Sequence, residues 1–131
     1  EPALLAQLFI SFAAAGGFLG VALGAFGAHA LRHRLDDYSL GIFQTAIQYQ
    51  FYHSLALLGV GLLCVWQPPS KLLLGSGWAF IAGTIIFSGS LLLLSFTGLR
   101  WLGAITPLGG LSLLVGWSLL LAWALKLGAS Q

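Results

Sequence analysis

The sequence predicts an all-α membrane protein built as a bundle of four transmembrane helices. The chain has only five Lys or Arg and three Asp or Glu among 131 residues, its mean hydropathy is +0.98, and four long apolar stretches fill most of it. A bilayer core needs about 20 apolar residues to be crossed by a helix. Barrel strands would alternate apolar and polar residues, which the four leucines at 91–94 do not do. Helices therefore form the predicted spans, within a single domain over residues 1–131.

The first span is expected over residues 4–30, and glycines recur along it. Gly16, Gly20 and Gly24 stand four residues apart, so they share one helix face and allow another backbone to approach closely. We expect this face to pack against a second helix, either of this chain or of another subunit. No Lys or Arg precedes Arg32, which favours a retained span over a secretory signal peptide.

A polar connection over residues 32–39 leads into the second span, expected over residues 40–66. Asp36 or Asp37 is expected to cap this helix. The first half of the span carries two adjacent polar rows at helical spacing, Gln44, Gln48 and Tyr52 in one and Thr45, Tyr49 and His53 in the other. Gln50 and Ser54 lie on a different face. Because polar groups are costly in lipid, we expect the two rows to turn inward, toward other helices or a cavity.

The third and fourth spans are expected over residues 72–96 and 108–126. A turn around Pro68 and Pro69 precedes the third span, and Pro107 suits the first turn of the fourth. Four spans place both termini on the side of the Pro68 turn. Basic residues are slightly more numerous at the opposite end, with Arg32, Arg34 and Arg100 against Lys71 and Lys126, which favours a cytoplasmic position for the charged loop.

Three readings of the polar residues follow. His29, Gln44, Gln48, Tyr49, Tyr52 and His53 form a candidate polar cluster between the first two spans. These side chains either hydrogen-bond between helices or line a polar route through the bundle, as in a small channel or transporter. The third and weaker reading is a metal or tetrapyrrole held by His29, His33 or His53. The four-residue spacing of His29 and His33 suits a metal, and His53 could ligate a tetrapyrrole singly.

The sequence lacks the residues that several classes of enzyme, pump and binding protein require. The spans contain no carboxylate, which argues against an Asp- or Glu-based ion pump and against a carboxylate hydrolase. No Ser/His/Asp set and no nucleotide-binding glycine loop can be assembled, and Cys64 is the only cysteine. The few charges do not form a nucleic-acid-binding patch. We therefore expect no enzymatic activity, no cofactor, no metal and no nucleic-acid partner.

The sequence resembles a known family in several blocks. These are residues 24–31 (GAFGAHAL), 43–50 (FQTAIQYQ), 52–57 (YHSLAL), 87–91 (FSGSL) and 106–110 (TPLGG). They are similar to the YgdD family of small membrane proteins, known as domain of unknown function 423, with Ser54 where an Ala-like residue is expected. The resemblance implies an integral protein of bacterial inner membranes, or of a thylakoid or mitochondrial inner membrane, and it implies no established activity.

The function expected from these observations is that of a non-enzymatic accessory subunit or scaffold in a membrane complex. Its expected partners are the lipid bilayer and other membrane-protein subunits or further copies of the chain. The small channel and the histidine-ligated site remain the alternatives.

Overall fold

The predicted four-span helical fold is confirmed by the computed structural model, which describes residues 2–68 and 70–129. The first span runs through α1 (Pro2–Val21), the π-helical segment η1 (Ala22–Gly27) and α2 (Ala28–Leu31). The other spans are α3 (Asp37–Trp66), α4 (Lys71–Thr97) and α5 (Thr106–Ala129), with the short 3₁₀ helix η2 (Arg100–Ala104) before α5. The described residues form no strand. The turn expected at Pro68 and Pro69 falls partly on Pro69, which lies outside the described residues.

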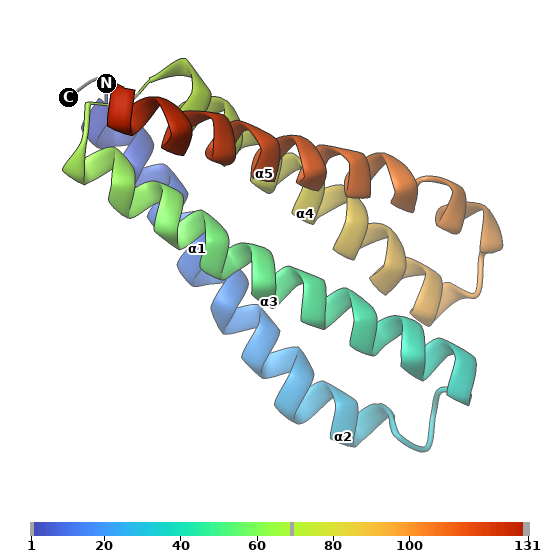
Figure 1. The fold of residues 1–131 in the computed structure, drawn as a ribbon. Helices are drawn as coiled ribbons and strands as arrows, with labels where there is room; N and C mark the ends of the chain where they lie inside the picture. The colour runs from blue at the N-terminus through green and yellow to red at the C-terminus, as the bar shows by residue number, and fades with distance from the viewer. Residues whose placement is uncertain (1, 69, 130–131) are drawn as a thin grey trace.

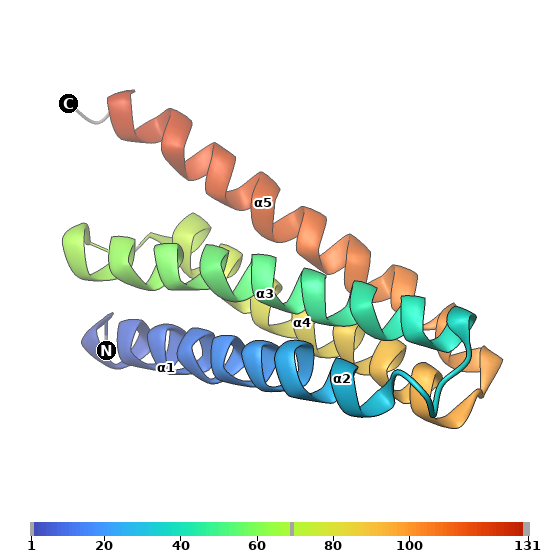
Figure 2. The same ribbon diagram turned by 90° about the horizontal axis from the view of Figure 1, so that it is seen from below.

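The four spans are packed in the order α1, α3, α4, α5 rather than as a closed square. Each span packs extensively on the next in that order, α1 meets α4 only marginally, and α3 and α5 make hardly any backbone contact. Figure 2 shows α5 diverging from α3 toward its C-terminal end. The N-terminal end of α1 and the C-terminal end of α5 lie at the same end of the bundle, and the 32–36 and 98–105 connections lie at the other (Figure 1). The edge helices α1 and α5 therefore have most of their surface free.

Local chemistry accounts for the ends of the long helices. Asp36 is the N-cap of α3 and accepts a hydrogen bond from the Ser39 backbone N–H at 2.8 Å. Ser70 caps α4 in the same way through the N–H of Leu73. Gly98 ends α4 with a φ of 73°, a left-handed conformation that glycine adopts without a Cβ penalty. At the same end of the bundle, the Arg100 guanidinium lies 5.8 Å from the centre of the Tyr38 ring.

Close packing through glycine joins each outer helix to its neighbour. Gly16, Gly20 and Gly24 all face α3, where an added Cβ would meet Ser54, Phe51 and Ile47, respectively. At the α4–α5 interface a Cβ on Gly83 would lie 2.9 Å from the backbone nitrogen of Leu113. Hydrophobic burial does not drive association between helices in lipid, so such close approach supplies the packing energy.

The sequence did not predict the π-helical turn in the first span. Residues 22–27 widen the helix just after Gly20, in a segment that contains Gly24 and Gly27. Glycine has a low helix propensity, and Gly24 and Gly27 lie against Ile47 and Phe43 of α3 in this segment. The segment between the third and fourth spans also contains regular structure, the 3₁₀ helix η2.

Candidate functional site

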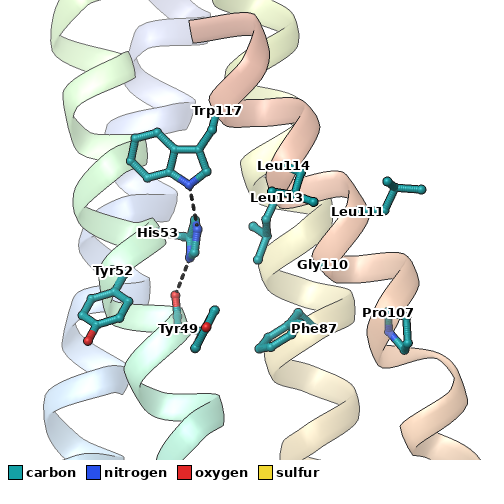
Figure 3. Close-up of a pocket in the computed structure, with 10 residues that line it drawn as sticks. All are labelled: Tyr49, Tyr52, His53, Phe87, Pro107, Gly110, Leu111, Leu113, Leu114 and Trp117. Carbon is teal, nitrogen blue, oxygen red and sulfur yellow. Dashed lines mark hydrogen bonds between the residues drawn. The ribbon is translucent and has the colours of Figure 1, made fainter. Parts of the chain in front are cut away.

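A cavity lies in the groove between α3 and α5, with α4 behind it (Figure 3). Its volume is about 680 Å³, within the range of about 300–1,000 Å³ typical of small-molecule sites. Aromatic rings from all three helices line it, joined by apolar residues of α5. The lining residues are Tyr49, Tyr52, His53, Phe87, Pro107, Gly110, Leu111, Leu113, Leu114 and Trp117.

His53 bridges the groove and is only 6% exposed. The Trp117 indole N–H donates a hydrogen bond to His53 Nε2 at 3.0 Å, and His53 Nδ1 lies 2.8 Å from the Tyr49 carbonyl oxygen. An indole nitrogen can only donate, so Nε2 must be the unprotonated acceptor. Nδ1 then carries the proton and donates a hydrogen bond to the Tyr49 carbonyl oxygen. Both ring nitrogens of a neutral imidazole are therefore occupied within the protein.

Aromatic contacts fix these side chains further. The His53 ring lies 5.7 Å from the Phe80 ring and 5.9 Å from the Trp117 ring, measured between ring centres. Tyr49 packs on Phe87 at 4.8 Å. Edge-to-face and offset pairs at these separations add stabilisation beyond simple contact area. Trp117 thus ties α5 to α3 across a gap that the two backbones do not close.

The prediction that both polar rows turn inward is wrong for much of the cluster. Gln44 and Gln48 are exposed on the outer surface of α3. The Gln48 amide donates at 2.6 Å to the hydroxyl of Tyr52, which is exposed and also contributes to the cavity lining. Tyr49 is partly exposed and lines the cavity, and His53 alone is buried. Partnering with a side chain four residues away lowers the cost of leaving these groups outside the bundle, so the rows need not turn inward.

Gln50 and Ser54, which the sequence places on a different face of α3 from the two polar rows, are the polar residues buried against α1. The Gln50 amide donates to the Gly16 carbonyl oxygen at 3.0 Å, and Ser54 packs beside Gly16. The Ser54 hydroxyl is buried and has no hydrogen-bond partner within residues 2–68 and 70–129. The available signal was their spacing with the buried apolar positions Phe43, Ala46, Ile47 and Leu57, which recur every three or four residues.

The structure does not bring His29 into the cluster. His29 is exposed at the end of the first span, and His33 is exposed in the following connection. His53 lies 16 residues into α3, about 24 Å along the helix from its first residue. No group of three or more His, Cys, Asp or Glu side chains within residues 2–68 and 70–129 is placed to hold a metal ion.

At the charged end of the bundle, the electrostatics of one carboxylate are set by its role as a helix cap. The backbone N–H of Ser39 donates to Asp36, and this hydrogen bond, assisted by the Ser39 side chain, lowers the pKa of the Asp36 carboxyl below its ordinary value. The charged form is stabilised because it accepts from an otherwise unpaired helix N–H.

Comparison with known proteins gives consistent matches. The family model described as "Protein of unknown function (DUF423)" matches residues 23–110. The UPF0382 membrane protein YwdK of Bacillus subtilis is 42% identical, over 78% of this chain and 83% of that protein. The UPF0382 inner membrane protein YgdD of Escherichia coli K12 is 39% identical, over 80% and 79%. A UPF0382 membrane protein of Staphylococcus epidermidis is 41% identical, over 78% and 82%. No solved structure is significantly similar. Tyr49 and His53 lie within residues 23–110, which the family model matches, and Trp117 lies beyond them.

Proposed function

The chain belongs to the DUF423 family and is a multi-pass integral protein of the inner membrane, and from this premise we propose that it is a non-enzymatic accessory subunit of a larger membrane complex. The proposal rests on the packing of the spans in an open row, which leaves α1 and α5 at its two edges. Only 22% of the most apolar window of the first span and 17% of that of the last are buried, against 44% in α4. The two edge helices thus offer long apolar faces on which other transmembrane helices can pack.

The use of the buried polar side chains supports the same role. Three buried side chains and the half-buried Ser112 donate to backbone carbonyl oxygens of neighbouring helices, in the pairs Gln50–Gly16, Ser76–Gly116, Ser88–Ala46 and Ser112–Ala79. Such bonds in a bilayer each stabilise helix association by about 0.6–2 kcal/mol. Polar groups used in this way hold four spans in a fixed arrangement, which is what a scaffold requires.

The same geometry favours the accessory role over a channel or transporter. A polar route through the bundle needs side chains with free donors and acceptors at successive depths. Both ring nitrogens of His53 are occupied, and Gln44 and Gln48 lie on the outer surface. The polar rows of α3 therefore do not line a continuous path through the described part of the chain.

Photocrosslinking in native membranes tests the proposal. Benzoylphenylalanine is placed at Phe18 in α1 and at Leu125 in α5, which are 74% and 71% exposed, and at Ile85 in the inner helix α4 as the lipid-facing control. The edge positions should give discrete protein adducts that comigrate with a complex preserved in mild detergent, and the Ile85 position should give none. Lipid adducts alone from all three positions, with a strictly monomeric purified protein, would refute the accessory role.

A further inference from the structure

Beyond the scaffold role, the cavity between α3 and α5 has the properties of a ligand site. We propose that it binds a membrane-soluble, quinone-type compound, a flat ring bearing carbonyl oxygens and an apolar tail, with the Tyr49 hydroxyl donating a hydrogen bond to a ring carbonyl. The inference concerns binding alone and is independent of whether the protein joins a complex.

The Tyr49 hydroxyl is the group that selects a carbonyl. Tyr49 lines the cavity, and its hydroxyl has no hydrogen-bond partner among the described residues, whereas the Tyr49 backbone carbonyl accepts from His53. The ring nitrogens of His53 and Trp117 already bond to each other, and the Tyr52 hydroxyl receives the Gln48 amide. A phenolic O–H in hydrocarbon without an acceptor is costly, so a ligand carbonyl would be stabilised at this point.

The walls of the cavity select a flat and uncharged ligand. Tyr49 and Phe87 pack together on one side, and the opposite side is formed by Pro107, Leu111 and Leu114 of α5 (Figure 3). No lining residue is charged. Aromatic faces favour stacked or edge-on contacts with another ring. A volume of about 680 Å³ accommodates a substituted ring and the first part of a tail.

Depth and extent identify the occupant as a small lipid-soluble molecule rather than a partner helix. Tyr49 is 12 residues after the start of α3 and 17 before its end, about 18 Å and 25 Å along the helix, so the cavity lies within the hydrocarbon layer. The lining covers Tyr49 to His53 on α3, about 6 Å of helix, and residues 107–117 on α5, about 15 Å. A transmembrane partner helix would need a groove about 30 Å long.

The test is photolabelling of the purified, lipid-reconstituted protein with an azido-benzoquinone carrying a ten-carbon chain. Labelling should saturate, map to the peptides containing Tyr49 or residues 107–117, and be displaced by decylubiquinone but not by decylbenzene, which has a ring and chain without carbonyls. Tyr49→Phe keeps the ring and removes the hydroxyl, and it should weaken decylubiquinone competition by about five- to tenfold, as expected for one hydrogen bond.

Filling the cavity provides a second, independent arm. A Cβ on Gly110 would lie 3.8 Å from the Phe87 ring, an ordinary contact, so Gly110→Leu should fold, occupy the cavity and abolish saturable labelling. Gly59→Leu, at a position where a Cβ meets nothing within 4 Å, is the matched control and should label like the wild type. Equal competition by decylbenzene, or unchanged decylubiquinone competition in Tyr49→Phe, would overturn the proposal and assign the cavity to ordinary acyl chains. If Gly110→Leu misfolds by circular dichroism, Tyr49→Phe decides.

Discussion

Replacing Gly83 with Ala should destabilise the protein through the α4–α5 interface. The added Cβ would lie 2.7 Å and 2.8 Å from Leu113 Cδ2 and Cγ and 2.9 Å from the Leu113 backbone nitrogen. Carbon atoms normally approach to about 3.5–4.0 Å, so relief needs a shift of about 0.7–1 Å. The leucine side chain can rotate away, but the backbone nitrogen moves only if α5 moves.

The expected size follows from two opposing effects. Overpacking of a tight interface costs about 1–3 kcal/mol, whereas Ala gains up to about 1 kcal/mol over Gly in helix propensity. Gly83→Ala should therefore lower the free energy of unfolding by about 1–2 kcal/mol. Gly59→Ala, with open space around its Cβ, should be neutral or slightly stabilising. Reversible unfolding in mixed micelles with added SDS, followed by circular dichroism, measures both variants. Equal stability of the two would show that α4 and α5 are not packed as described.

Three further perturbations test individual contacts by the same unfolding assay. Ser54→Ala removes a buried hydroxyl that has no partner among the described residues, and it should stabilise the protein by about 1 kcal/mol. It should also partly rescue Gly16→Ala, whose new Cβ would meet the Ser54 hydroxyl. Strictly additive effects of the two substitutions would contradict this contact. Trp117→Phe removes the donor to His53 and should lower the free energy of unfolding by about 1 kcal/mol, and by less in a His53→Ala background. An equal loss in both backgrounds would show that the two residues are not coupled. The Ser39 N–H lowers the pKa of Asp36, so the stability that the charged cap contributes is present above the ordinary Asp range and is lost as pH falls through the lowered pKa. Asp36→Asn keeps the cap and should abolish this acid-range loss in melting temperature. An identical loss in both proteins would be inconsistent with the cap.

Hydropathy made the four spans predictable, since the bilayer dictates both their length and their helical form. A cap at Asp36 or Asp37 was predictable for a similarly local reason, because a cap depends on residues within one turn, and Asp36 is the one that forms it. The glycine row in the first span predicted a close approach but not its partner, which proved to be α3 of the same chain. Features determined within one helix could thus be read from the sequence.

Features that depend on two helices could not be read in this way. The choice between the Gln44–Gln48 face and the Gln50–Ser54 face of α3 depends on which face meets α1, and both faces carry polar residues. The bond between Trp117 and His53 joins residues 64 positions apart, so no local pattern indicates it. The open packing order of the spans likewise follows from contacts between α3 and α4 that no single span encodes.

The protonation state of His53 is the most direct measurement, because the structural role of the α3 polar residues requires both of its ring nitrogens to be occupied. Solid-state ¹⁵N NMR of histidine-labelled protein in lipid, with His29 and His33 replaced by Gln, reports the two nitrogens of His53 alone. The predicted result is a neutral ring with the proton on Nδ1, and an unprotonated Nε2 that shows a through-space contact with the Trp117 indole N–H. A proton on Nε2, or a ring nitrogen in contact with water, would contradict the structural role and would restore the polar route through the bundle.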